Sequence, residues 1–243
     1  MQLVIEKPVT VITPSVGSPK LKDAIDSVAN QTYACKHLIV CDGTEYFDKV
    51  FKLAVGGSIQ FCVTPENTGK TGGNFYGHRI YAAYPHLINS DYILFLDEDN
   101  WYEPNHVETL VKTVEDKNLD FSYSLRKIFS PTKEYLCDDN CESLGYWESI
   151  FPPHHSFVDT NCYCFKRKYL MRHSHLFFGH HFYMDRLFYT EIVKVLPEYD
   201  CNGEHTVNYR VRGHHEKMHE GGNAKTLSAY QGNYPWTKNR SSL

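Results

Sequence analysis

Short apolar runs alternate with segments of helical periodicity over residues 1–100. The β-branched run at 9–13 suits a buried parallel strand, and Leu21, Ile25 and Val28 then recur at helical spacing. Parallel strands need a long crossover, usually a helix, so this alternation predicts an α/β fold with a mostly parallel sheet. In such sheets, ligands bind at the carboxyl ends of the strands. The expected strands are 9–13, 37–41, 58–63 and 91–96, and the expected helices are 19–30 (with Ser18 as N-cap and Pro19 as first residue), 46–55 and 75–84.

The second half of the chain is less regular. Residues 126–158 carry Pro, Asp, Asn and His and are predicted to form a long connection, and the chain from Asn202 onward is predicted to be a loop-rich tail. No repeat or low-complexity linker divides the sequence, so we expect one domain over 1–243. The regular elements expected here are a helix at 104–116, a strand at 161–165 and a helix at 182–196.

Composition narrows the class of protein. Hydrophobic residues make up 42% and charged residues 22%, as in ordinary globular domains, and the formal charge of −4 gives no footprint for nucleic acid or an anionic membrane. A local basic face remains open at Lys166, Arg167, Lys168 and Arg172. No apolar run reaches the length of a membrane span, and the N-terminus has no signal-peptide pattern. We therefore expect a cytoplasmic protein without a membrane anchor.

The eight cysteines are expected to be reduced thiols in such a compartment. Cys137 and Cys141 form one close pair, and Cys162 and Cys164 form another. Neither pair has the repeated CxxC spacing of a structural zinc site, so we expect buried free thiols instead.

Each predicted strand of the first half runs into small, hydroxyl-bearing or acidic residues. Parallel topology brings these strand ends to one edge of the sheet. Three consecutive acids after a buried strand repel one another. This pattern indicates either a solvated turn or a site where a divalent cation neutralises their charge. Carboxylates beside a diphosphate suit Mg²⁺ or Mn²⁺. The four strand ends are Thr13-Pro14-Ser15, Asp42-Gly43, Asn67-Thr68-Gly69 and Asp97-Glu98-Asp99.

The same segments carry a family resemblance. The stretches VTVITPSVGSPKLKDAIDSVANQTY, LIVCDG, ENTG and DYILFLDEDNWYEP resemble, in this order, the nucleotide-binding half of family 2 glycosyltransferases with the GT-A fold. The resemblance covers residues 7–115. It implies transfer of a sugar from a nucleoside diphosphate sugar, typically a UDP-sugar, to an acceptor with inversion at the anomeric carbon. It also implies a nucleotide-sugar-binding half at 1–100 and an acceptor-binding half at 101–243.

The resemblance assigns expected roles to the strand ends. Thr13, Pro14 and Ser15 would line the nucleotide pocket, and Asp42 would hydrogen-bond the base. Asp97-Glu98-Asp99 would be the acidic metal-binding motif (DXD). Within it, Asp99 would bind Mn²⁺ or Mg²⁺ directly, Asp97 would lie near the ribose or the metal, and Glu98 would lie beside the donor.

One part of the family pattern is missing. Family members usually carry Ala-Arg-Asn after the glycine that follows the third strand, and this chain has Lys70 and a longer run after Gly69. Gly69 would still allow close approach to the donor. Lys70 or Arg79 could supply the missing positive charge, although a helix could equally present Arg79 to solvent.

The resemblance also implies a general base at the start of a helix beyond the acceptor-side strand. Asp185 stands there, preceded by Met184 instead of the family's glutamate. An aspartate in the first turn of a helix could instead only interact favourably with the helix dipole, and Glu191 is the next candidate base.

Related folds place a metal-binding histidine near the C-terminus, which suggests His214 or His215 in a glycine-rich segment expected to close over the donor. A solvated loop is the plain alternative.

Two other functions compete with glycosyl transfer. A sugar nucleotidyltransferase usually needs a glycine-rich loop with a Lys or Arg directly after the first strand, and TPSVGSPK holds one Gly and one Lys there. A catalytically silent nucleotide-sugar-binding module would need no base at Asp185. The acceptor stays open among a saccharide, a protein and a modified DNA base, and the missing membrane anchor disfavours a lipid-linked glycan.

Overall fold

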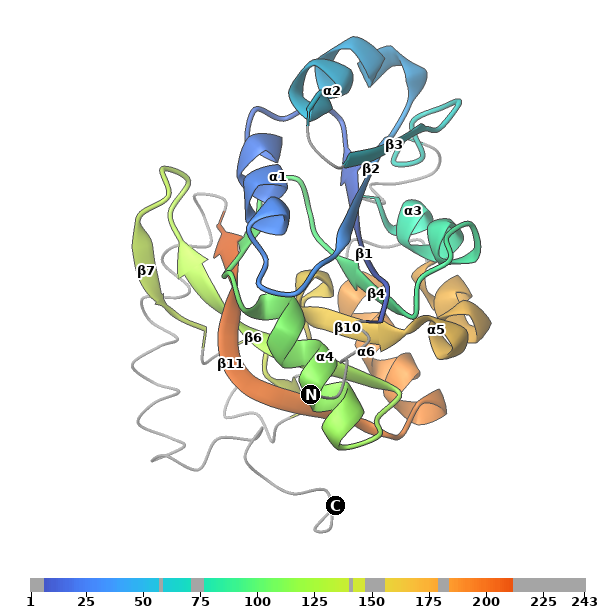
Figure 1. The fold of residues 1–243 in the computed structure, drawn as a ribbon, viewed down its shortest axis with the longest axis vertical. Helices are drawn as coiled ribbons and strands as arrows, with labels where there is room; N and C mark the ends of the chain where they lie inside the picture. Colours follow the sequence, from blue (N-terminus) through green and yellow to red (C-terminus); the bar gives the residue numbers. More distant parts are fainter. Residues whose placement is uncertain are drawn as a thin grey trace, which may run out of the picture.

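The computed structural model describes residues 7–56, 59–70, 77–139, 142–146, 156–178 and 184–211. It is a mixed α/β fold with a curled, mostly parallel sheet flanked by helices, which confirms the predicted fold class (Figure 1). The sheet has nine strands in the order β3-β2-β1-β4-β10-β6-β11-β5, and β7 pairs with β6 beside this path. A separate two-stranded sheet joins β8 and β9.

The first half follows the predicted alternation. Strands β1 to β4 are mutually parallel in the order β3-β2-β1-β4, because a helical crossover connects each of them to the next along the chain. The strands are β1 (Val9–Ser15), β2 (Lys36–Cys41), β3 (Ile59–Val63) and β4 (Tyr92–Phe95). The helices are α1 (Leu21–Ala29), α2 (Phe47–Ala54) and α3 (His78–Ala83), with 3₁₀ turns η1 (Thr44–Tyr46) and η2 (Tyr84–His86).

The predicted cap of the first helix is wrong. Helix α1 begins at Leu21 with Lys20 as its N-cap, so Ser18 and Pro19 precede the helix. The backbone N–H of Ser18 donates to the carboxylate of Glu98 at 3.0 Å. Ser18 therefore belongs to the loop at the sheet edge, where its N–H binds an acid from another strand end.

The second half extends the same sheet. Strand β10 runs antiparallel between β4 and β6, and β11 lies parallel to β6 along most of its length (Figure 1). The strands are β5 (Trp101–Tyr102), β6 (Phe121–Phe129), β7 (Tyr135–Asp138), β8 (Gly145–Tyr146), β9 (Ser156–Phe157), β10 (Tyr163–Lys166) and β11 (Tyr199–Arg210). The helical elements are α4 (His106–Asp116), η3 (Thr160–Cys162), α5 (Arg167–His173), η4 (Ser174–Phe177) and α6 (Met184–Val195).

Two predictions for the second half are wrong. The connection at 126–158 instead begins inside β6 and contains β7, β8 and β9. The predicted loop-rich tail is wrong for its first residues, because 202–210 belong to β11, whose backbone is paired with β6 through Arg210; residues 212–243 lie outside the described residues. Register shifts between Cys201 and Val207 interrupt the alternation that would have marked this strand in the sequence.

Helix α4 packs its apolar face on the second half of the sheet. Val107, Leu110 and Val114 are fully buried there, against β6, β10 and β11. A second layer is aromatic, because Phe177 of η4 stacks on Phe188 of α6 at 3.7 Å between ring centroids. Burial of these apolar faces stabilises the packing of the helices on the sheet.

Two sequence expectations concern the whole chain. Seven cysteines lie in the described ranges, and all of them are free thiols, whereas Cys141 falls outside these ranges. Across the described ranges, no helix combines the length and the apolar character that a membrane crossing requires.

Candidate functional site

The strand ends meet at one edge of the sheet. The register pairs Ser15 with Cys41 and Ile12 with Phe95, so the residues after β1, β2 and β4 lie side by side. Asp42 directly follows the paired Cys41. The acidic turn 97–99 comes two residues after Phe95 and faces the end of β1.

Glu98 closes the loop after β1 onto this turn. Its Oε2 accepts from Ser15 Oγ at 2.5 Å and from Ser18 N at 3.0 Å. Burial raises the pKa of Glu98, and these hydrogen bonds oppose the rise. The geometry gives Glu98 a structural task, since the oxygen facing the loop already has two donors.

Asp97 is held from two sides. Tyr81 of α3 donates its hydroxyl to Oδ1 at 2.6 Å, and Asn161 Nδ2 donates to Oδ2 at 2.9 Å. Burial, together with the nearby carboxylates of Asp159 and Asp99, raises the pKa of Asp97 to about 7, although the hydrogen bonds from Tyr81 and Asn161 oppose the rise. A carboxylate with this pKa is poised to gain from a cation, which would favour its charged form.

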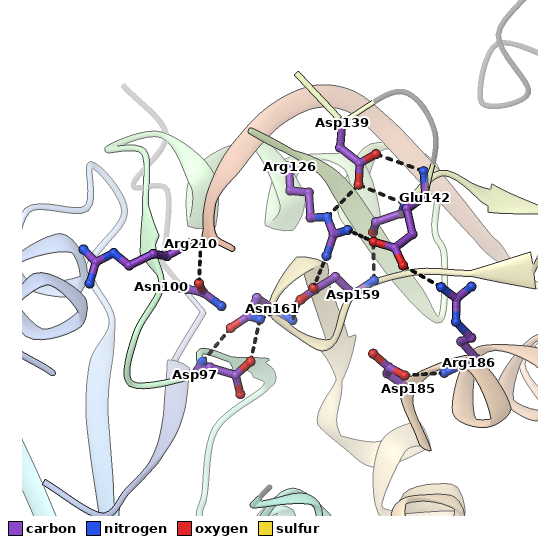
Figure 2. A network of polar contacts seen from close by, with 11 residues as sticks. Asp97, Asn100, Arg126, Asp139, Glu142, Asp159, Asn161, Asp185, Arg186 and Arg210 are labelled. Atoms are coloured by element: carbon purple, nitrogen blue, oxygen red, sulfur yellow. Dashed lines mark hydrogen bonds and ion pairs between the residues drawn. The ribbon is translucent and has the colours of Figure 1, made fainter. Parts of the chain in front are cut away.

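Asp99 is the acid of the turn that the protein leaves available. Its carboxylate takes part in no side-chain hydrogen bond or ion pair with any residue of the described ranges, and it is partly exposed. The next residue, Asn100, is 1% exposed, and its Oδ1 accepts from Arg210 N at 2.9 Å. The end of β11 is thereby fastened to the acidic turn, while the Arg210 guanidinium points away from Asp97 (Figure 2).

Asp42 organises the loop after β3. Its Oδ1 accepts from Thr68 N at 2.8 Å, and its Oδ2 accepts from Thr68 Oγ1 at 3.2 Å. Asn67 Nδ2 donates to the Asp42 backbone oxygen at 2.8 Å. Gly43 has φ +113°, and a Cβ there would lie 2.9 Å from Asn67 N, so this close approach requires glycine. Asp42, at 4% exposure, thus joins two strand ends.

The residues at the end of β1 face different neighbours. Thr13 Oγ1 hydrogen-bonds His37 Nε2 of β2 at 2.8 Å, and burial lowers the pKa of His37 to about 3. The Thr13 hydroxyl is therefore directed along the sheet. Pro14 packs against Gly77, where a Cβ would come 2.7 Å from the proline ring. Gly77 has φ +85° and precedes α3, so this contact sets where the helix begins.

The candidates for a positive charge beside the donor lie in separate places. Lys70 forms an exposed ion pair with Glu45 at 2.8 Å, and its ammonium lies 5.3 Å from the ring of Tyr46. Gly69 lies in the turn before it, where Lys70 N donates to Asn67 O at 3.3 Å. Arg79 is partly buried in the first turn of α3, two residues before Tyr81.

Asp185 lies in the first turn of α6. Its Oδ1 accepts from Arg186 N at 2.8 Å. Burial raises the pKa of Asp185 to about 7, with the Asp159 carboxylate as the next cause. Glu191 is turned outward and pairs with Lys194 at 2.7 Å. His214 and His215 lie outside the described residues.

Sequence reasoning missed the turn that joins these acids. Asp159 caps η3, with Oδ1 accepting from Asn161 N at 2.9 Å, and its Oδ2 accepts from Arg126 Nη1 at 2.5 Å. Asn161 Oδ1 also accepts from Asp97 N at 2.5 Å. Figure 2 shows Asp97 and Asp185 on either side of this turn. The only sequence signal is the Asp-Thr-Asn run before β10, which is typical of a capped turn.

The acid set suits a cation shared with a ligand. Within the described ranges, no group of three or more His, Cys, Asp or Glu side chains is arranged to hold a metal alone. A Mg²⁺ ion usually needs only one or two carboxylates when substrate phosphates supply further oxygens. Asp99, with Asp97 beside it, meets that requirement, whereas Glu98 is directed at the loop after β1.

The candidate basic face lies away from this edge. Lys166 pairs with Tyr92, the first residue of β4, whereas the acidic turn follows the last residue of that strand. Helix α5, which carries Arg167, Lys168 and Arg172, follows Lys166 directly. The register therefore places the start of the basic segment at the opposite end of β4.

Comparison with known proteins agrees with this geometry. The family described as Glycosyl transferase family 2 matches residues 10–173. No curated protein matches the chain.

Solved structures of TarS from S. aureus share the fold. The TarS 1–349 complex with UDP has a TM-score of 0.60 and 12% identity, over 97% of this chain and 68% of that chain. TarS 1–349 alone has a TM-score of 0.61 and 10% identity, over 97% and 76%. The complex of TarS 1–349 with UDP-GlcNAc has a TM-score of 0.58 and 13% identity, over 87% and 60%.

The family match spans β1 through α5, and therefore includes the ends of β1, β2, β3 and β4. The likeness to TarS confirms the GT-A architecture predicted from the sequence motifs. This chain belongs to glycosyl transferase family 2 and is a glycosyltransferase.

Proposed function

We propose that this chain transfers a sugar from a UDP-linked donor to an acceptor hydroxyl, with inversion and with Mn²⁺ or Mg²⁺ as cofactor. The observation that carries the proposal is the placement of Asp97 and Asp185 on either side of the Asp159 turn (Figure 2). Burial and Asp159 raise the pKa of both to about 7. Acids with strongly raised pKa values cluster at functional sites, which supports a site at this turn with separate donor and acceptor tasks.

Asp99 and Asp97 form the donor side. The open carboxylate of Asp99 suits direct contact with the cation, and Asp97 suits the ribose or the metal's water shell. When bound, the cation would stabilise the charge of the departing diphosphate. The structures of TarS with UDP and with UDP-GlcNAc support a uridine nucleotide as the first donor to test.

Asp185 forms the acceptor side. The acceptor oxygen attacks the anomeric carbon from the face opposite the diphosphate, and the bond from that carbon to the diphosphate breaks with its electron pair. The hydroxyl proton passes to Asp185. A base with a pKa near 7 is matched to neutral pH, because about half of it is ionised there and the ionised form is basic enough to accept the proton.

The remaining strand ends complete the proposed donor pocket. Asp42 contacts the base, because a carboxylate that accepts from three groups of Thr64 and Thr68 still retains a lone pair for another N–H. Pro14, Ser15 and Gly69 shape the pocket, with Thr13 and Glu98 acting through the contacts that hold it. Lys70 or Arg79 lies near the diphosphate, and His214 or His215 supplies a further metal ligand. The seven free cysteines fit a reducing compartment such as the cytoplasm.

A thermal-shift screen tests donor and cation together. UDP-sugars should raise the melting temperature with Mn²⁺ or Mg²⁺ and not with chelator, and UDP release should then depend on an acceptor. The acceptor panel holds saccharides, peptides and DNA with a hydroxyl-bearing base. Pyrophosphate release from a nucleoside triphosphate and a sugar phosphate would instead favour a nucleotidyltransferase. Donor binding without release on any acceptor would favour a silent binding module.

A further inference from the structure

A buried arginine is connected to both Asp97, on the proposed donor side, and the first turn of α6, which carries the proposed base Asp185. Arg126 of β6 is 1% exposed, and its three guanidinium nitrogens donate to three carboxylates. Nε lies 2.6 Å from Asp139 Oδ2, Nη1 lies 2.5 Å from Asp159 Oδ2, and Nη2 donates to Glu142 Oε2. A planar guanidinium has fixed donor directions, so it determines where its carboxylate partners lie.

One arm of this cluster leads to the donor side. Asp159 uses Oδ2 for Arg126 and Oδ1 for Asn161, whose N and Nδ2 lie 2.9 Å and 2.6 Å away. Asn161 then contacts Asp97 twice, because Asn161 Oδ1 accepts from the Asp97 backbone N–H and Asn161 Nδ2 donates to Asp97 Oδ2. The position of Asp97 therefore follows from the position of the guanidinium.

The other arm leads to the proposed base. Glu142 uses Oε2 for Arg126 and Oε1 for Arg186 Nη2, the latter at 2.5 Å. The Arg186 guanidinium also lies 4.5 Å from the ring of Phe157, and its backbone N–H donates to Asp185 Oδ1. This arm holds the first turn of α6 against the same arginine (Figure 2).

We propose that Arg126 is a positioning residue that sets the placement of Asp97 relative to Asp185 through its two carboxylate arms, Asp159 and Glu142. The inference rests on the proposed function, because it presumes that these two acids serve donor and base. A role in folding alone is the competing explanation. Buried ion clusters are weak contributors to stability compared with apolar packing, so a cluster with both arms ending at the proposed site favours positioning.

Glu142→Gln tests the arm to the base. Glutamine keeps the size and one accepting oxygen but loses the charge, so the fold should survive while the α6 turn loosens. We expect kcat to fall about ten-fold or more, with the donor KM unchanged, because small misplacements of catalytic groups are costly. Arg126→Lys tests both arms, since one ammonium cannot bridge three carboxylates, and should lower kcat by about 10²-fold and raise the donor KM.

The pH profile gives a readout that a folding role would not move. The charged and titratable groups facing Asp185 in the described ranges are Asp159, Glu142, Arg186 and Tyr163. Removing the negative charge of Glu142 should lower the pH at which Asp185 ionises, so the acid limb of the kcat profile should move to lower pH. Glu115→Gln is the matched control, because it removes a carboxylate paired with Lys7 at 2.6 Å on α4.

The outcomes separate the two proposals. Suppose that wild type and Glu115→Gln both transfer sugar. The positioning role is then overturned if Glu142→Gln has the same kcat and the same pH profile as wild type. This holds whatever the melting temperature of Glu142→Gln. If wild type transfers no sugar to any acceptor, the proposed function fails. Positioning is then tested by measuring the melting temperature as a function of pH. The pH at the midpoint of this dependence should be lower for Glu142→Gln than for wild type. If this midpoint pH is the same in both proteins, the inference is overturned. If Arg126→Lys does not fold, the results for Glu142→Gln decide the question by themselves.

Discussion

Asn161 forms two hydrogen bonds with Asp97. Asn161 Oδ1 accepts from the Asp97 backbone N–H at 2.5 Å, and Asn161 Nδ2 donates to Asp97 Oδ2 at 2.9 Å. The two residues come from β10's leading turn and from the end of β4, which are neighbours in the sheet. The acidic turn is thus held by a residue from the second half of the chain, which we propose binds the acceptor. Donor binding and acceptor chemistry are therefore expected to be mechanically linked.

Asn161→Ala should disturb the donor side. The substitution removes both contacts to Asp97 and one donor to Asp159, the Asn161 Nδ2 group, which should cost about 1–3 kcal/mol of unfolding free energy. We expect a raised donor KM and a lower kcat, measured by steady-state UDP release. Asn105→Ala, which removes an exposed contact to Glu204, is the control and should change neither.

Asp99→Ala should abolish the cation's effect on donor binding while leaving the fold intact. The carboxylate has no hydrogen-bond partner in the described ranges, so its loss breaks no internal contact. Thermal shift by UDP with Mn²⁺ should vanish, and transfer should fall to background. Asp48→Ala, an exposed acid on α2, should behave as wild type. Full wild-type activity in excess chelator would show that no cation is needed.

Asp42→Asn should weaken donor affinity and leave kcat near wild type. The amide keeps one accepting oxygen but presents an NH₂ to Thr68, so the loop after β3 loses one hydrogen bond. We expect a donor KM about ten-fold higher, because the base contact is remote from the bond that breaks. A large fall in kcat at unchanged donor affinity would place Asp42 elsewhere in the mechanism.

Asp185→Asn should separate chemistry from binding. The amide keeps the hydrogen bond from Arg186 N but cannot take a proton, so transfer should fall by about 10²–10⁴-fold with donor affinity unchanged. Near-wild-type transfer would mean that Asp185 only caps its helix. Glu191→Gln on the same helix is the control.

The same variant should change stability with pH. The pKa of Asp185 lies near 7 in the folded state, above its ordinary value of 3.8, so the folded state holds the proton more tightly than the unfolded state. Stability from this group is therefore lost as pH rises between these two values. Asp185→Asn lacks the ionisation, and its melting temperature should exceed that of wild type by a few °C at about pH 8 and by less at about pH 5. An equal difference at both pH values would contradict the raised pKa.

The edge where the strand ends meet could be predicted from the sequence, because these residues follow strands in a parallel series. Once the alternation is recognised, topology alone brings 42, 67–69 and 97–99 to one side. The helix carrying Asp185 was also predictable from its periodicity. The hydrogen-bond partners of each carboxylate were not predictable. Glu98 and Asp99 are neighbours in sequence, yet Glu98 accepts a hydrogen bond from Ser15 and Asp99 has no such partner in the described ranges.

Strand β11 and the arginine cluster depended on tertiary structure. The irregular pairing of β11 breaks the alternation that marks a strand, and its backbone is satisfied by β6, far earlier in the chain. Arg126 reads as a surface residue in isolation, and only the convergence of Asp139, Glu142 and Asp159 makes its burial possible. Local sequence determined the elements and their order, through periodicity and strand-end chemistry. Long-range packing decided the partners of each buried charge, because such a charge is stable only where distant segments bring its counter-charges together.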